Sequence, residues 1–166
     1  MERKSSSKER QNKMEKEADA VKKLLNKFDI KIIKHKPTYT AVESSKERGI
    51  PLSQGVKSLI LDLDGKIIEV LISGDYKIDL NKLKKYFNVK NAKLADKEVV
   101  FKKTNCEIGS VHPFCKIFNN IETYIDKSVL RNEKVDFSIG NFGESIEMKT
   151  KDFVSVLKVE VIDVGK

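Results

Sequence analysis

One β-hairpin constrains the fold of this chain more than any other feature. The strand-like runs Val56–Leu63 and Lys66–Ile72 flank Asp64-Gly65, a pair preferred in type I′ turns because both turn residues take positive φ. The second run is apolar on both of its faces, which is typical of a strand in the middle of a sheet. We therefore predict that this hairpin lies at the centre of a sheet.

Periodicity and capping residues predict helices on either side of the hairpin. An apolar stripe at i, i+3, i+4 and i+7 predicts a helix over residues 17–28, and the Thr40…Glu43 capping box predicts a short helix ending near Gly49. Further elements are helices capped by Asp79, Asp96 and Thr150, and strands at 30–36, 92–94, 121–125, 134–139, 145–148 and 159–164. Helices interspersed with hairpins indicate a mixed α+β single domain rather than a regular βαβ repeat.

The charge of the chain suggests an anionic partner. The formal net charge is +8 and nearly all of the excess is lysine, which suits diffuse attraction to nucleic-acid phosphates better than base-specific contacts. A genomic bias towards Lys, Asn and Ile is the alternative explanation. Residues 1–16 carry both charge signs and little to bury, so we expect a flexible charged tail there or a frayed extension of the helix that follows.

Other features of the sequence indicate where the protein acts. It has neither an apolar run of membrane-spanning length nor an apolar N-terminal signal segment. Two cysteines do not make a disulfide framework. We therefore expect a cytoplasmic protein without membrane contact.

The segment Glu107–Phe114, Glu-Ile-Gly-Ser-Val-His-Pro-Phe, predicts a stiff loop. Gly109 permits backbone conformations closed to other residues, while Pro113 stiffens the exit and pushes His112 towards an extended shape. Such a loop can present backbone N–H groups to a ligand, although Gly and Pro also mark ordinary turns.

Lys57 is the most conspicuous charged residue of the predicted hairpin. Alternation places it on one face with Leu59 and Leu61, and lysine is rarely buried without a partner. Its ammonium is either held for a phosphate or carboxylate of a ligand, or it reaches water from the mouth of the strand.

The cysteines and histidines do not predict a metal centre. The spacing C-x5-H-x2-C of Cys106, His112 and Cys115 matches no common zinc site, and the only other histidine is His35. No motif for a nucleotide-binding P-loop, a serine nucleophile or a zinc protease is present. We expect no metal, no cofactor and no cysteine nucleophile.

Taken together, the segments resemble the YbaK / prolyl-tRNA synthetase-associated domain family of tRNA editing proteins. The resemblance covers about residues 20–158, and its pieces follow the order found in that family. The similar segments are Thr40-Ala41-Val42-Glu43, Gly55–Leu61 with Lys57, Ile78–Leu83, the G-x-x-x-P loop Gly109–Phe114, Ile125–Leu130 and Ser138-Ile139-Gly140.

The resemblance implies a mixed, mostly antiparallel β-sheet flanked by helices, with residues 17–166 as the editing domain. It also implies a free-standing deacylase that acts on the aminoacylated 3′ end of tRNA, most plausibly proline-type tRNA bearing Ala or Cys, and an association with a synthetase. Family precedent makes Lys57 and Gly109 catalytic: Lys57 would position the ester, and amides of the Gly109 loop would hold the oxyanion. A water or a group of the substrate would attack. The remaining implied substrate contacts are Thr40, Ser110, Val111, His112, Pro113, Phe114, Ser138 and Gly140.

Two departures from the family pattern affect the expected specificity. Thr104-Asn105 stands where the family has Thr-Gly, and Asn141-Phe142 stands where some members have a histidine. Asn tolerates positive φ well, so the backbone at Asn105 can be preserved. The alternatives to a deacylase are a non-catalytic tRNA- or nucleotide-binding module and general nucleic-acid binding through lysines.

Overall fold

The computed structural model describes residues 6–166. The helices are α1 (Ser7–Leu25), α2 (Ala41–Arg48), α3 (Leu80–Phe87), α4 (Lys97–Thr104), α5 (Cys115–Phe118) and α6 (Thr150–Leu157), with 3₁₀ turns η1 (Leu52–Gln54) and η2 (Lys127–Arg131). The strands are β1 (Ile30–Lys34), β2 (Gly55–Leu63), β3 (Lys66–Ser73), β4 (Ala92–Leu94), β5 (Glu122–Asp126), β6 (Lys134–Ser138), β7 (Glu144–Lys149) and β8 (Glu160–Ile162).

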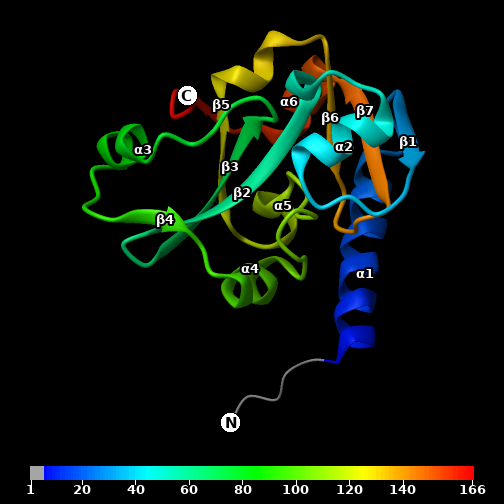
Figure 1. The fold of residues 1–166 in the computed structure, drawn as a ribbon, viewed down its shortest axis with the longest axis horizontal. Helices are drawn as coiled ribbons and strands as arrows, with labels where there is room; N and C mark the ends of the chain where they lie inside the picture. Colours follow the sequence, from blue (N-terminus) through cyan, green and yellow to red (C-terminus); the bar gives the residue numbers. More distant parts are fainter. Residues whose placement is uncertain (1–5) are drawn as a thin grey trace.

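Within the described residues, all eight strands form one mixed sheet in the order β1-β7-β6-β2-β3-β5-β8, and β4 pairs with β2 beside this path. Antiparallel pairs join β1 to β7, β7 to β6, and β2 to β3 and β4. Parallel pairs join β2 to β6, β3 to β5 and β5 to β8. This arrangement confirms the predicted α+β class with its mostly antiparallel sheet, and the hairpin β2–β3 lies at its centre (Figure 1).

Local sequence signals explain the elements around the hairpin. Asp64 and Gly65 both have positive φ, 50° and 94°, as a type I′ turn requires. The Thr40 hydroxyl accepts a hydrogen bond from the Glu43 amide at 3.1 Å, and Gly49 ends α2 in the left-handed region. Two predicted caps are wrong in detail, because Asp96 makes no side-chain cap and Thr150 is already the first residue of α6.

The helices cover the two faces of the central hairpin. On one face, α1 and α6 pack against β6, β7 and the residue Phe114 to form the main core, and α4 with Cys106 and Cys115 continues this layer against Ile60. On the other face, α3 and the C-terminal segment cover Leu61 and Val70. Figure 1 shows α1 and α3 at opposite ends of the molecule with the hairpin between them.

The first helix begins earlier than the sequence predicts. Residues 7–16, for which the sequence allowed a flexible tail or a frayed helix extension, form the first half of α1, which starts with a capping box between Ser6 and Glu9. Arg10 connects the first half of α1 to the rest of the domain. Its guanidinium forms ion pairs with Glu98 and Glu107 and lies over the Phe101 ring. Residues 1–5 of the predicted tail lie outside the described residues. No helix within residues 6–166 has the length and apolar character needed to cross a membrane.

Candidate active site

A gap in strand pairing along one edge of β2 positions a pocket. On this edge β6 pairs only with Gly55 and Val56, whereas β4 pairs only with Leu61–Leu63. Between these two pairings lies a pocket of about 340 Å³. Because it lies at an edge, side chains from both faces of β2 reach it, and residues 57–60 all contribute to its lining.

Lys57 lines this pocket from the face of β2 that also carries Leu59. Its side chain is half-buried, and its ammonium donates a short hydrogen bond to the carbonyl oxygen of Tyr76. Burial lowers the pKa of Lys57, a shift that the nearby carboxylate of Asp75 opposes and the charge of Lys77 reinforces. A residue that lines the pocket therefore carries a partly desolvated cation, whose hydrogen-bond partner is the Tyr76 carbonyl.

The Gly109 loop contributes Ile108, Gly109 and Val111 to the lining of the same pocket. Gly109 has a φ of 91°, and a Cβ there would lie 2.7 Å from the carbonyl oxygen of Tyr39, so glycine is required for both conformation and space. The hydroxyl of Ser138 links the loop to β6 by a 3.4 Å hydrogen bond to the Gly109 carbonyl.

The amides of the loop differ in their availability. The Ser110 amide donates to the Glu107 carbonyl and the Phe114 amide to Nδ1 of His112, while the His112 amide interacts with the thiol of Cys106. Pro113 has no amide hydrogen. Within the described residues, the loop members that line the pocket and whose amides donate no hydrogen bond are Ile108, Gly109 and Val111.

A buried carboxyl group lies beneath the loop. Glu69 of β3 is fully buried and accepts hydrogen bonds from the Cys115 amide at 3.2 Å, from the Thr123 hydroxyl at 2.9 Å and, over a short distance, from the Ser58 hydroxyl. The Ser58 hydroxyl is also 3.3 Å from the carbonyl oxygen of His112. Burial raises the pKa of the Glu69 carboxyl, although these hydrogen bonds act in the opposite direction. Glu69 thus joins the pocket strand β2 to the exit of the loop.

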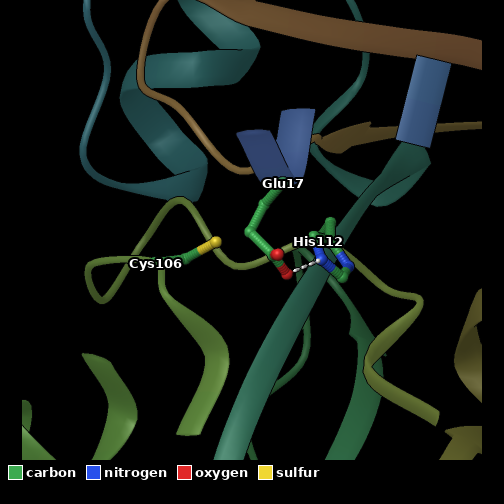
Figure 2. A group of neighbouring side chains, drawn as sticks. All are labelled: Glu17, Cys106 and His112. Atoms are coloured by element: carbon green, nitrogen blue, oxygen red, sulfur yellow. Dashed lines mark hydrogen bonds and ion pairs between the residues drawn. The ribbon is translucent and has the colours of Figure 1, made fainter. Parts of the chain in front are cut away.

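Figure 2 shows a second polar cluster, formed by Glu17, Cys106 and His112. Their candidate donor atoms all lie within 4.8 Å of one another. Nδ1 of His112 accepts the Phe114 amide hydrogen at 3.1 Å, so Nε2 of the neutral ring carries the proton and donates it to Glu17 at 3.0 Å. Burial raises the pKa of the Cys106 thiol, which keeps it protonated. Metal binding would have to displace both protons, so this donor set fits a hydrogen-bonded cluster better than a metal centre.

The structure separates the predicted site residues into two groups. Lys57, Gly109, Thr40, Val111 and Ser138 line the pocket. The other five lie behind its walls and are buried: Ser110, His112, Pro113, Phe114 and Gly140. The side chains of Ser110 and His112, which the resemblance implied as substrate contacts, point to the Glu107 carbonyl and to Glu17.

Sequence reasoning missed three acidic residues around the site. Glu17 and Glu69 support the loop, and Asp136 of β6, fully buried beside Gly55, lines the pocket. Glu69 and Asp136 had a detectable signal, because each interrupts a strand-like apolar run with a carboxylate. Glu17 had none, since its partner His112 is distant in the sequence.

Comparison with known proteins identifies the family of this chain. Residues 35–156 match the sequence profile described as the aminoacyl-tRNA editing domain. The chain belongs to the aminoacyl-tRNA editing domain family. Its activity is that of an aminoacyl-tRNA deacylase, which hydrolyses the ester joining an amino acid to tRNA.

Other members of the editing domain family are similar over most of the chain or part of it. The Ser/Thr-tRNA deacylase ProXp-y of Escherichia coli is 24% identical over 140 residues, which are 81% of this chain and 83% of that protein. A proline–tRNA ligase of Staphylococcus aureus is 34% identical over 90 residues, 54% of this chain but 16% of the ligase. A crystal structure described as a candidate trans-editing enzyme for prolyl-tRNA synthetase has a TM-score of 0.77 and 24% identity, with 90% and 97% of the two chains covered.

Proposed function

We propose that this editing domain acts in trans on proline-type tRNA that carries Ala or Cys. The observation that carries the proposal is one pocket lined both by Lys57 and by Gly109 and Val111, whose amides donate no hydrogen bond. The likeness to part of a proline–tRNA ligase supports the tRNA type. The name of the Escherichia coli relative makes Ser and Thr the competing substrates.

Lys57 and the loop suit the two ends of an aminoacyl ester. The ammonium of Lys57 would bind the terminal phosphate and ribose and so position the ester. The amides of Gly109 and Val111 would polarise the ester carbonyl and stabilise the oxyanion that forms during attack. A water molecule or a substrate group is the nucleophile, because burial raises the pKa of both cysteine thiols and leaves them unreactive.

The pocket would select its amino acid mainly by size and shape. Apolar side chains of Val56, Ile60, Val100 and Val111 contribute to its lining. One methylene in such a pocket changes binding by only about 1–3 kcal/mol, which explains why charging errors between similar amino acids need a second site. The setting of this activity is the cytoplasm, and a prolyl-tRNA synthetase is the partner we expect.

A deacylation screen tests the proposal. Proline-type tRNA charged with Ala, Cys, Ser or Thr is incubated with the protein, and release of each amino acid is followed under steady-state conditions. We expect the largest kcat/KM for Ala or Cys. Preference for Ser or Thr would overturn the substrate assignment and leave the deacylase intact, whereas binding without turnover on all four would indicate a tRNA-binding module.

A further inference from the structure

The first helix reaches the wall of the pocket from outside the conserved domain. The family profile begins at residue 35, whereas Glu17 lies in the middle of α1. Its carboxylate accepts hydrogen bonds from Nε2 of His112 at 3.0 Å and from the Asn119 side-chain amide at 2.9 Å. Figure 2 shows Glu17 extending from α1 towards the His112 ring. One side chain of α1 thus contacts both the loop and the end of the short helix that follows it.

His112 transmits this contact to the backbone of the loop. The ring is fully buried, and its second nitrogen accepts the Phe114 amide at 3.1 Å. The ring also lies edge-on to Phe118, 5.7 Å between centroids. Because both ring nitrogens are hydrogen-bonded, the orientation of His112 is fixed, and with it the backbone next to Val111.

Other contacts hold α1 rigidly in this position. Arg10, near its start, pairs with Glu107 at the beginning of the loop at 2.8 Å. Further along, α1 packs so closely on Gly140 that a Cβ there would lie 3.2 Å from backbone atoms of Met14 and Ala18. The helix therefore contacts the Gly109 loop and the turn that follows β6, which both adjoin the pocket.

We propose that Glu17 is a positioning residue, which acts through His112 to fix the Gly109 and Val111 amides in the orientation that catalysis requires. This inference rests on the proposed function of those amides. If the inference holds, α1 contributes to the active site through Glu17 and is more than an N-terminal extension of the domain. A misplacement of catalytic groups by about 1 Å can cost on the order of 10²-fold in rate, so loss of Glu17 should appear in kcat.

Substitutions at Glu17 test the proposal in the full-length protein. We expect Glu17→Ala to lower kcat by about 10- to 100-fold with little change in KM. Glu17→Gln keeps an oxygen that accepts from His112 and should retain activity within about threefold. Asp19→Ala is the matched control, because Asp19 is an exposed carboxylate on the same helix. Wild-type kcat in Glu17→Ala would overturn the proposal.

A double-mutant cycle distinguishes positioning from general destabilisation. If Glu17 acts through His112, then combining Glu17→Ala with His112→Ala should lower kcat little beyond the lower single variant. If the reductions in kcat of the two single variants multiply in the double variant, the proposal is overturned. Glu17→Asp is the further variant in case Glu17→Ala does not fold: it keeps the charge, withdraws the carboxylate from Nε2 and should lower kcat between the values of the other two substitutions.

NMR spectra of the backbone amides test the positioning role of Glu17 without relying on deacylation activity. We expect Glu17→Ala to shift the backbone amide resonances of Gly109 and Val111, and Asp19→Ala to leave them in place. Unshifted resonances would overturn the positioning role even if no charged tRNA were hydrolysed. Wild-type turnover combined with unshifted resonances would overturn this inference alone and leave the proposed function standing.

Discussion

Gly109 lies so close to Tyr39 that only a hydrogen fits between the Gly109 α-carbon and the Tyr39 carbonyl oxygen: a Cβ would be 2.7 Å from that oxygen. The obstructing atom is backbone and cannot rotate away. The segment before α2 therefore packs directly on the wall that carries the proposed oxyanion amides.

Gly109→Ala should consequently damage both the loop and the activity. The substitution adds a clash to a backbone with positive φ, so we expect lower thermal stability and a fall in kcat/KM of at least about 10²-fold. Gly143→Ala is the matched control, because its Cβ would lie 3.7 Å from its nearest neighbour, the His35 carbonyl. Equal activity of the two variants would contradict the role of the loop.

Lys57→Ala should remove the positioning charge from the pocket. We expect kcat/KM to fall by about 10²- to 10³-fold, while far-UV circular dichroism and the melting temperature change little. Lys57→Arg should not restore activity, since a planar guanidinium cannot reproduce a compact ammonium. Lys66→Ala, an exposed lysine of the neighbouring strand, provides the comparison. A fully active Lys57→Ala protein would rule out the assigned role.

Glu69 should make the stability of the protein depend on pH. Burial raises the pKa of its carboxyl in the folded state, so the folded protein retains this proton to a higher pH than the unfolded chain. Its contribution to the free energy of unfolding is complete below the ordinary pKa of 4.5 and is lost as pH rises through the folded value. Urea denaturation at several pH values should show Glu69→Gln gaining stability relative to wild type as pH increases. A constant difference between the two proteins would refute this.

Removal of metal ions should leave the protein unaffected. Nε2 of His112 and the thiol of Cys106 both carry protons in the cluster with Glu17. Because protonated groups do not bind a metal ion, EDTA has no bound metal to remove from this cluster. We expect unchanged deacylation and an unchanged melting temperature after dialysis against EDTA, with elemental analysis as the check. Stoichiometric zinc, or activity restored by zinc, would show that the cluster is a metal site.

The parts of the fold predicted from sequence are those that local chemistry determines. The turn at Asp64-Gly65 and the cap at Thr40 involve residues within four positions of each other, so their patterns are visible in the chain. The sequence did not decide between a tail and a helix for the first half of α1, because this half buries little apolar surface. What holds it is the pairing of Arg10 with Glu98 and Glu107, about ninety residues away.

The sequence predicted the candidate site only in part, as it did the fold. The resemblance named Lys57 and Gly109 as the catalytic residues; both line one pocket, and their catalytic roles stay predictions. It could not separate loop residues that line the pocket from those that lie behind it, such as His112, because the direction of each side chain depends on tertiary packing. The partners Glu17 and Glu69 come from remote elements, and no spacing in the sequence connects them to the loop.

The interrupted pairing along β2 has a consequence for how such proteins diversify. The width of this opening depends on where β6 and β4 hydrogen-bond to the central strand, which is a property of the backbone. Residues that line the opening, such as Leu59 and Val100, can therefore be exchanged without a change in strand register. One scaffold can acquire new amino-acid preferences by single substitutions while the hydrolytic groups stay in place.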